Sequence, residues 1–389
     1  MNFDLTGDQR SLRDAARTFA RNEMTQVART CEKENQPPPR AVKKQLAAMG
    51  FLGINMPAQY GGMGLGNLEA LLVLEEFAKV HPAVAFPIFE SAVGPIKAVE
   101  RFGTESLKAQ LLPKVVSGDT VVAVAMSEPD AGTALTDLTT TAKVESGRIV
   151  INGTKRWCTG AGTADGYVVY CRIGETKGAK GAKGVGAVYV PAGVKGLSFG
   201  AREELMGFRG TTTADIFFEN VEVPEDHLIV PAGGFPKLME AFDLERCGNA
   251  TMCLGLAAGA LEDALAYVQE RQQFGKPLAD FQAVQITLAG MAMKVEASRL
   301  LIHRAVTQAS HGFPSVADSS IAKCFANEMV REVTGAALQL MGGYGYSKAF
   351  PAEQRLRDAW GWGIAGGTID IQKINIASAL VGRRFDQRR

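Results

Sequence analysis

The sequence predicts an α+β protein in which a small β-domain lies between two helical domains. Three observations predict this class: helical periodicity over roughly the first 118 residues, a run of short β-branched segments after it, and a return of helical periodicity to the end of the chain. We place the domains at residues 1–119, 120–232 and 233–389. Strands and helices do not alternate along the chain, which argues against a doubly wound parallel sheet.

The first domain has apolar residues spaced three and four positions apart. Leu12, Ala15, Ala16, Phe19 and Ala20 follow this spacing, and so does the segment LEALLVLEEFAKV. The segments QPPPR and MPAQYGGMGLGN interrupt the pattern with proline and glycine. We therefore expect several separate helices in this domain.

The middle domain contains six short segments rich in β-branched and aromatic residues, separated by Gly, Asn and Pro. They lie within DTVVAVAMSEPDAGT, GRIVINGTKRW, GYVVYCRI, GAVYVP, GLSFG and ADIFFENVEVP. This spacing predicts an antiparallel sheet or a small barrel. The tract GETKGAKGAKGVG, between two of these strands, is interpreted as a solvated hairpin loop.

The third domain has long helical segments at 238–271, 280–310 and 315–341. A helix of about 30 residues is roughly 45 Å long. Such lengths predict an up-and-down bundle that is able to associate with copies of itself.

The composition is that of an ordinary globular protein. The 42 basic and 41 acidic residues nearly cancel, so no overall charge favours nucleic acid or an anionic membrane surface. The N-terminus lacks the pattern of a signal peptide, and the apolar runs are shorter than the roughly 20 residues of a membrane span. We therefore expect a cytoplasmic protein without a membrane span. The six cysteines and four histidines show no metal-ligand spacing, and buried reduced thiols are expected.

The segment GWGIAGGTIDIQ, residues 361–372, carries the dinucleotide spacing G-x-G-x-x-G at Gly361, Gly363 and Gly366. A nucleotide-binding turn of that type follows a strand and opens a helix in a βαβ unit. Here the charged helical segment AEQRLRDAW precedes it, and the chain ends before a second strand could follow. We interpret the segment as a turn between helices, with Thr368 as the N-cap of the last helix.

Four other segments occur in a characteristic order. AMSEPDAGT ends a strand in a hydroxyl-rich loop, KRWCTGAG places a Trp and a Thr beside a Gly-rich turn, ERQQFGKPLADFQAVQ begins at a helix end, and ALQLMGGYGY contains paired glycines. In this α–β–α setting they resemble the acyl-CoA dehydrogenase family over essentially the whole chain, with GGTIDIQ at the place of its C-terminal active-site loop. The resemblance implies an N-terminal helical domain, a middle antiparallel β-barrel domain and a C-terminal four-helix bundle, with FAD between the last two.

The resemblance also implies which residues bind FAD. An indole face suits a flat ring system, and a threonine hydroxyl can donate a hydrogen bond to the ring edge. One set of positions would contact the flavin of the same chain: Met126, Ser127 and Thr133 at the flavin or pyrophosphate, with Trp157 and Thr159 flanking the isoalloxazine ring. A second set matches positions that bind the FAD of a neighbouring subunit, which implies a homotetramer or homodimer: Arg271, Phe274, Gln282, Gln339, Gly343 and Thr368.

The catalytic base is not where many members of the family have it. The family's reaction needs a carboxylate to remove the weakly acidic α-proton of a thioester, while the β-hydrogen leaves as hydride to flavin N5. Many members place a Glu in the C-terminal loop, where this chain has Gly366. A subset, including the isovaleryl- and long-chain-type enzymes, places it on the first helix of the C-terminal domain, where this chain has AFDLERCGNA. We predict Glu245 as the base, with Arg246 beside it at the substrate.

Glu90 lies in HPAVAFPIFESAVG, a segment that lines the acyl pocket in the family. Two interpretations remain open: its side chain points to solvent, or it faces the pocket and disfavours an acidic acyl chain. Phe86 and Phe89 in the same segment favour an apolar acyl end.

The resemblance predicts an FAD-dependent dehydrogenase of an acyl-CoA thioester that passes electrons to an electron-transfer flavoprotein. Two alternatives remain. One is a flavoenzyme of the same fold with other chemistry, such as an oxidase, a reductase or a desulfinase. The other is a non-catalytic subunit that binds FAD or acyl-CoA.

Overall fold

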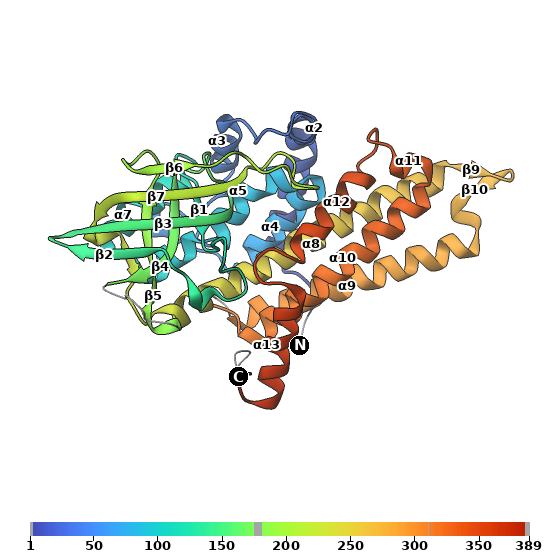
Figure 1. Cartoon of the computed structure of the whole chain (residues 1–389). Coiled ribbons are helices and arrows are strands. Elements are labelled where there is room, and N and C mark those ends of the chain that lie inside the picture. Colours follow the sequence, from blue (N-terminus) through green and yellow to red (C-terminus); the bar gives the residue numbers. More distant parts are fainter. Residues whose placement is uncertain (1–2, 175–180, 310, 386–389) are drawn as a thin grey trace.

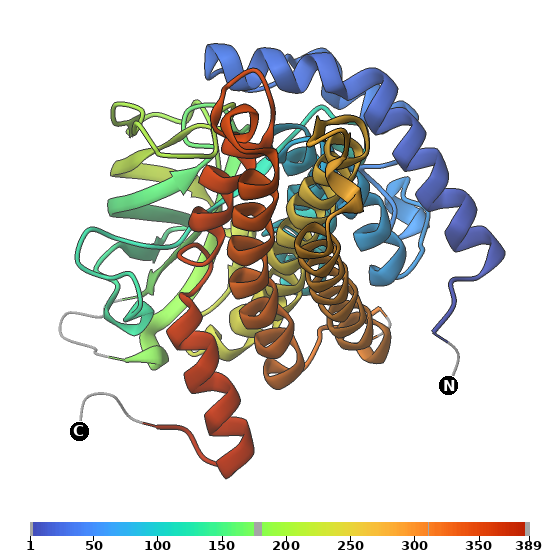
Figure 2. The ribbon, with the colours of Figure 1, turned by 90° about the vertical axis from the view of Figure 1, so that its right-hand side faces the viewer.

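A long helix, α8 (Phe235–Glu270), runs through the middle of the molecule and touches all three parts of the chain. We describe a computed structural model that covers residues 3–174, 181–309 and 311–385. Figure 1 shows the sheet at one end, the hairpin end of the helical bundle at the other, and the N-terminal helices beside α8. Figure 2 shows the molecule from the bundle side, with the C-terminal helices in front, the sheet on the left and the N-terminal helices along the top and right. The predicted α+β class is confirmed.

The N-terminal part consists of short helices whose ends have local causes. The first begins in a capping box, in which Thr6 and Gln9 exchange side-chain hydrogen bonds with each other's backbone N–H groups. The helix that carries Glu90 begins after His81, whose ring accepts from Ala83 N at 3.0 Å. The helices are α1 (Gly7–Phe19), continued by a π-helical turn (Ala20–Met24), α2 (Thr25–Glu34), α3 (Arg40–Ala48), α4 (Asn67–Val80), α5 (Pro82–Ala92), α6 (Ile96–Phe102) and α7 (Glu105–Val116).

The middle part is an eight-stranded sheet with the order β6-β7-β3-β2-β4-β5-β8, and β1 pairs with β4 outside this path. Alternating burial along the long strands β3 and β7 places one face on a core and the other toward solvent. The strands are β1 (Val122–Ala125), β2 (Thr141–Glu145), β3 (Arg148–Thr159), β4 (Gly166–Ile173), β5 (Val185–Pro191), β6 (Leu197–Phe199), β7 (Thr213–Pro224) and β8 (Leu228–Val230).

The sheet differs from the prediction in two respects. All six predicted strands are present, and β2 and β8 are additional. The sequence does not predict them, because the β2 segment TAKVE is short and polar, and the β8 segment LIV has only three residues. The sheet is also not wholly antiparallel, since β4 pairs in parallel with both β1 and β2. The predicted hairpin tract joins the antiparallel strands β4 and β5, and its residues 175–180 lie outside the described residues.

The C-terminal part is the predicted bundle of long helices. Besides α8 it contains α9 (Gln282–Ala309), α10 (Val316–Met341), α11 (Gly343–Tyr346), α12 (Ala352–Trp362) and α13 (Ile369–Val381), with a two-stranded hairpin of β9 (Gln272–Gln273) and β10 (Lys276–Pro277) after α8. By length and composition α8 could span a membrane, contrary to the expectation that no segment is long and apolar enough. However, 67% of its most apolar window is buried in the protein, as in a core helix. All six cysteines are free and buried, as expected.

Glycines let α8 approach the N-terminal helices closely. A Cβ at Gly255 would lie 2.4 Å from the Ala78 Cβ of α4, and one at Gly248 would lie 2.3 Å from a Val93 methyl group beyond α5. No side chain larger than hydrogen fits at either position unless the neighbouring groups shift. The close approach at Gly248 brings α8 against the end of α5, near Glu90.

The glycine-rich segment joins α12 to α13, so its interpretation as an inter-helix turn is confirmed. Gly366 and Gly367 have φ of 67° and 85°, in the left-handed region that favours glycine. The Thr368 side chain accepts from Ile371 N and caps α13.

Candidate active site

Glu245 lies on the face of α8 that looks toward the sheet and α5. Its side chain is partly exposed, and it forms no hydrogen bond or ion pair with the described residues. Burial raises the pKa of the Glu245 carboxyl to about 8, although the positive charges of Arg246 and Lys323 lower it. A carboxylate without a fixed partner and with a pKa near neutrality has the properties of a general base. Its catalytic role stays a prediction.

Arg246 does not neutralise Glu245 by pairing with it. Its guanidinium bonds to Asp243 on the same helix, and Asp243 also accepts from the Ser319 hydroxyl of α10 at 2.8 Å. The guanidinium lies 5.5 Å from the Phe242 ring centre, and its buried Nε atom has no partner among the described residues. Arg246 therefore forms no ion pair with Glu245 among the described residues, because Asp243 occupies its guanidinium.

Lys323 of α10, which no sequence motif marks, donates hydrogen bonds to the backbone of the C-terminal loop between α12 and α13. Its fully buried Nζ atom donates to Asn327 Oδ1 at 2.8 Å, to Gly367 O at 2.9 Å and to Trp362 O at 3.3 Å. Burial lowers the pKa of this ammonium to about 8. A Cβ at Gly366 would lie 3.6 Å from Lys323 Cε. Gly366, the loop position at which many members of the family have a glutamate, therefore lies beside the buried ammonium group of Lys323.

Glu90 does not point to solvent, so that interpretation is wrong. Its Oε2 atom is buried without a hydrogen-bond partner, and it lies 2.7 Å from where a Gly94 Cβ would stand. Burial raises the pKa of Glu90 well above its usual range, and the nearby Glu245 carboxylate raises it further. Glu90 and Glu245, 155 residues apart, are therefore electrostatically coupled across the contact between α5 and α8.

Aromatic side chains from the sheet and from the end of α12 lie near these two glutamates. Tyr170 of β4 is buried, and Glu245 and burial both raise its pKa, while Arg246 lowers it. Trp362 stacks on Phe86 of α5 at 5.7 Å and 25°, and it also contacts Phe89 and Phe208. Glu245 thus has a tyrosine of the sheet near it, and Glu90 follows an aromatic cluster on α5.

A β-bulge in β3 turns Trp157 outward. The register advances three residues on β3, from Lys155 to Cys158, against two on β7, so one residue is extra. Trp157 adopts φ of 61° there and leaves its indole 54% exposed, while Lys155 and Cys158 are buried. Arg156 lies 4.3 Å from the indole centre. The bulge thus presents a flat aromatic surface, with Thr159 two residues further along the same strand.

The loop after β1 is fixed next to this bulge. Ser127 O accepts from Arg156 N at 2.9 Å, and Met126 O accepts from Lys155 Nζ at 2.9 Å. Lys155 also pairs with Glu128 at 2.8 Å. Burial alone would raise the pKa of Glu128, but the charge of Lys155 and several hydrogen bonds lower it to about 2. Met126, Ser127, Trp157 and Thr159 are thus brought together, while Thr133 lies in an exposed part of the loop.

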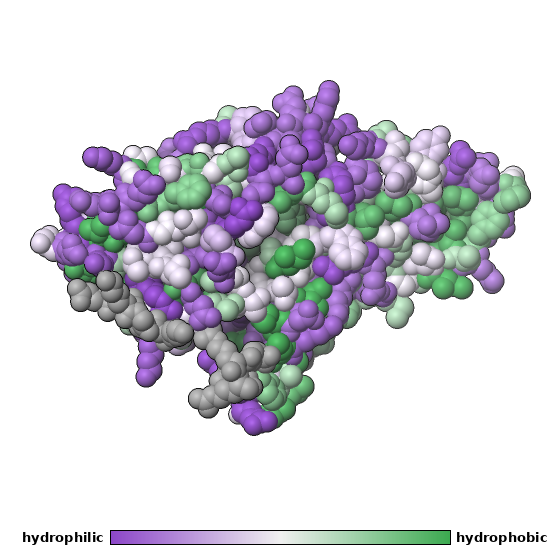
Figure 3. All heavy atoms as spheres, in the orientation of Figure 1, coloured by the Kyte–Doolittle hydropathy of each residue, from purple (hydrophilic) through white to green (hydrophobic). Residues whose placement is uncertain are grey.

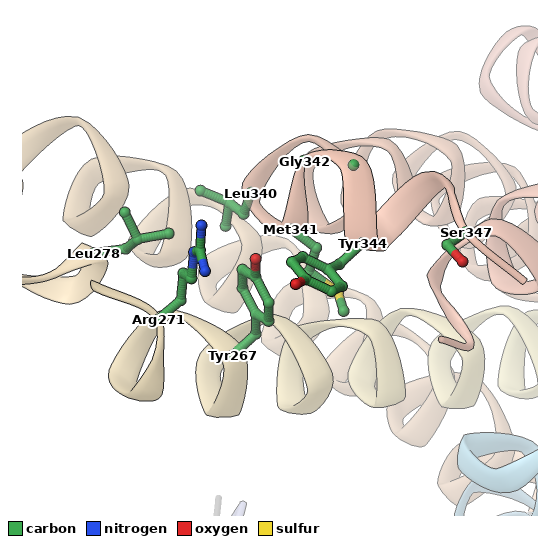
Figure 4. Close-up of a pocket in the computed structure, with 9 residues that line it drawn as sticks. Tyr267, Arg271, Leu278, Leu340, Met341, Gly342, Tyr344 and Ser347 are labelled. Atoms are coloured by element: carbon green, nitrogen blue, oxygen red, sulfur yellow. The ribbon is translucent and has the colours of Figure 1, made fainter. Parts of the chain in front are cut away.

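The other predicted set lies at the far end of the bundle. Arg271 and Gly343 line a pocket of about 450 Å³, in which Tyr267 and Tyr344 form one wall (Figure 4). The Arg271 guanidinium lies 5.9 Å from the Tyr344 ring centre. Phe274, in the β9–β10 hairpin, is 94% exposed, and exposed Gln282 and Gln339 lie at the adjoining helix ends. The two tyrosines were missed, because a tyrosine in a helical pattern usually indicates packing.

Within one chain the two sets do not meet. Trp157 is on β3 of the sheet, whereas Arg271 and Phe274 are at the β9–β10 hairpin, which lies at the opposite end of the molecule (Figure 1), and Thr368 caps α13. An open indole beside a rigid loop fits a flat ring, and a glycine-lined pocket with a guanidinium fits a pyrophosphate. The chemistry of both sets fits FAD.

Comparison with known proteins agrees with this geometry. Three domain models of one family match the chain: the N-terminal domain of acyl-CoA dehydrogenase at residues 6–119, the middle domain at 123–221 and the C-terminal domain at 232–381. An acryloyl-CoA reductase (NADH) of Anaerotignum propionicum is 38% identical over 98% of this chain and 97% of its own length. A 3-sulfinopropanoyl-CoA desulfinase of Cupriavidus necator is 34% identical over 100% of this chain and 98% of its own length.

Solved structures give the same result. Butyryl-CoA dehydrogenase from Megasphaera elsdenii is 32% identical and superimposes with a TM-score of 0.92 over 98% of this chain and 100% of its own. The FAD complex of PigA is 28% identical, with a TM-score of 0.91 over 98% and 99% of the two chains. The fold, the two flavin-type residue sets and the matches along the whole length lead to one conclusion: the chain belongs to the acyl-CoA dehydrogenase family of FAD-dependent enzymes.

Proposed function

We propose that this protein catalyses the α,β-dehydrogenation of a short acyl-CoA thioester, with Glu245 as the base that removes the α-proton. One observation carries the proposal: a partly buried carboxyl group of raised pKa and without a fixed partner lies near a loop in which Gly366 cannot act as a base. A non-catalytic subunit would have no need to keep a charged group in such surroundings, because burying it costs stability.

The residues around Glu245 keep it available for proton transfer. Asp243 and Ser319 hold Arg246, so the guanidinium remains near the carboxylate without capping it. Lys323 holds the backbone of the C-terminal loop, and the aromatic cluster of Phe86, Phe89 and Trp362 excludes water from one side. A bound acyl chain would displace further water, which strengthens electrostatic interactions within the site. When bound, FAD supplies the acceptor for the β-hydrogen and its electron pair.

The reverse reaction, reduction of an enoyl-CoA thioester, is the second candidate. A relative 38% identical to the chain is named acryloyl-CoA reductase. With a pKa of about 8, Glu245 is largely protonated at neutral pH, and a protonated carboxyl can deliver a proton to the α-carbon. The same residue thus serves both directions, so the direction is set by the electron donor or acceptor.

Self-association and an electron-transfer flavoprotein as electron acceptor belong to the same proposal. Exposed apolar side chains gather at the hairpin end and along α9, among them Phe274, Ile286 and Met293, and Figure 3 shows apolar surface at this end. Exposed patches of this kind mark interaction sites. In a homodimer or homotetramer formed through this end, the residues around Arg271 of one copy would meet the residues around Trp157 of another copy, and together they would complete one FAD site.

Anaerobic titration of the purified yellow protein with butyryl-CoA tests the proposal. A dehydrogenase loses its visible flavin absorbance in proportion to the thioester added, and an electron-transfer flavoprotein then restores it. A reductase shows little bleaching with the saturated thioester, but its chemically reduced form is reoxidised by the unsaturated one. A flavin that responds to neither thioester would contradict both candidates.

A further inference from the structure

Glu90 has an oxygen atom for which the protein provides no partner. Its Oε2 is buried and forms no hydrogen bond, and Glu90 is otherwise in no ion pair among the described residues. A polar group that is buried without a partner lowers the stability of the fold, so most buried polar groups in proteins have a hydrogen-bond partner. A buried oxygen without a partner next to the predicted base suggests that a bound molecule supplies the partner.

The position of Glu90 is fixed rather than adjustable. Its carboxyl lies in the space that a side chain at Gly94 would fill, with the would-be Cβ 2.7 Å from Oε2. On α8, Gly248 allows Phe89, next to Glu90, to approach within 3.0 Å of the would-be Cβ. Glu245 lies one turn before Gly248 on the same helix, so it shares approximately the same face. The two carboxyl groups therefore face one space between α5 and α8.

The walls of this space restrict what it can hold. The aromatic cluster of Phe86, Phe89 and Trp362 lies beside Glu90 on α5 and gives this side an apolar lining of packed rings. Buried Tyr170 borders the space from the sheet, close enough to Glu245 for the carboxylate to raise the pKa of its hydroxyl. The site thus offers mostly apolar contacts, with the unpaired Oε2 of Glu90 among them.

Charge decides which polar group fits. An acyl chain with a carboxylate would place a third acidic group beside Glu90 and Glu245, where burial already disfavours the charged form of both carboxyl groups. A chain with an ammonium group would have to give up its water near Arg246 and Lys323, whose positive charges already surround Glu245. A hydroxyl group is uncharged, and it both donates and accepts a hydrogen bond, as a carboxyl group of raised pKa does.

We propose that Glu90 selects a short acyl-CoA thioester whose acyl chain carries a hydroxyl group, which forms the missing hydrogen bond to the Glu90 carboxyl. This inference rests on the proposed function, because it assumes that the space beside Glu245 holds the acyl chain. It replaces the expectation of a purely apolar acyl end with an apolar chain that has one polar substituent.

The test compares kcat/KM for butyryl- and 4-hydroxybutyryl-CoA and for pentanoyl- and 5-hydroxypentanoyl-CoA, in the direction of flavin reduction. The wild-type protein is expected to favour one of the hydroxylated chains by about tenfold, the size of one hydrogen bond. Glu90→Gln keeps a hydrogen-bonding group and is expected to retain most of this preference. Glu90→Leu is expected to reverse it, by weakening turnover of the hydroxylated chain and improving turnover of its parent. Glu34→Leu, at an exposed glutamate of the same domain, is the control.

Bound FAD and the circular dichroism spectrum show whether each variant folds. If Glu90→Leu loses FAD, Glu90→Met, with an unbranched side chain of similar length, takes its place. If the ratio of kcat/KM for the hydroxylated chain to kcat/KM for its unsubstituted parent is the same in the wild type and in the apolar variant, this inference is overturned and the proposed function is left intact. A wild-type flavin that no thioester of the panel reduces overturns the proposed dehydrogenation and the inference with it.

Discussion

The surroundings of Glu245 disfavour the ionised form of its carboxyl group. Burial raises its pKa to about 8, and only Arg246 and Lys323 act in the opposite direction. For a base this means that the active, ionised fraction is small at pH 6.5 and about half at pH 8. The same carboxyl exposed to water would be ionised throughout this range.

We therefore expect kcat/KM for dehydrogenation to rise with pH through about 8 and to level off above it. Lys323 titrates in the same range, since burial lowers its pKa to about 8. However, loss of its proton weakens the support of the loop and so lowers the rate as pH rises. The sign of the pH dependence thus distinguishes the two groups. A profile measured with one stable thioester between pH 6 and 9 that is flat or falling would contradict the assignment of Glu245.

Lys323 is expected to stabilise both the fold and the loop. Lys323→Met leaves the carbonyl groups of Trp362 and Gly367 without their donor, so the free energy of unfolding should fall by about 2 kcal/mol or more. Lys373→Met removes an exposed lysine that pairs with Glu328 at the surface, and it should change stability by less than about 1 kcal/mol. Urea denaturation of both variants measures this, and equal losses would mean that the buried bonds contribute little.

At the scale of elements, the loop after β1 depends on one buried ion pair. Glu128 accepts from Lys155 and from the backbone of Thr139 and Thr140, which holds the predicted flavin loop on β3. Because the pKa of Glu128 is lowered from 4.5 to about 2, its stabilising effect is present above pH 4.5 and is lost as pH falls through about 2.

Glu128→Gln should accordingly lower stability at neutral pH and make it less dependent on pH between about 4.5 and 2. The variant should also bind FAD more weakly, since Met126 and Ser127 lose their fixed position. Thermal unfolding followed at several pH values, with FAD content measured in parallel, checks both effects. If wild type and variant lose stability in parallel over this pH range, the ion pair is not responsible.

The sequence predicts elements better than it predicts their irregularities. Helical periodicity gives α8, α9 and α10 to within a few residues, because their apolar faces are long. The bulge that turns Trp157 outward leaves no such signal, since it depends on pairing between β3 and β7, which are far apart in the sequence. The parallel pairing of β1 and β2 with β4 is missed for the same reason.

At the scale of the whole molecule, the candidate site combines distant segments. The family motifs predict Glu245 and the flavin-type residues, but not that Glu90 and Glu245 face each other. That proximity goes with close packing at Gly248 and Gly94, which no local pattern marks. Lys323 and Tyr170 are missed because a single lysine or tyrosine in a regular pattern usually indicates surface or packing. The chemistry of the site could thus be predicted from sequence in part, and its acyl specificity could not.

Assembly is expected to depend on the exposed hairpin end. Phe274→Ser removes a side chain that is 94% exposed in the single chain, so the monomer should remain folded. If a second copy covers it, the variant should form smaller assemblies and lose FAD together. Light scattering and the ratio of flavin to protein absorbance measure this. Phe3→Ser, at an exposed phenylalanine before the first helix, is the control, and equal behaviour of the two variants would argue against an interface at the hairpin end.

The central claim is that Glu245 removes the α-proton. Rapid mixing of the Glu245→Gln variant with a thioester that reduces the wild-type flavin tests it most directly, with Glu240→Gln, an exposed glutamate one turn earlier on α8, as the control. We predict that Glu245→Gln keeps FAD and still binds the thioester, while the rate constant of flavin reduction falls at least about 100-fold. The control should react at the wild-type rate. Flavin reduction in Glu245→Gln at a rate close to that of the wild type would contradict the account.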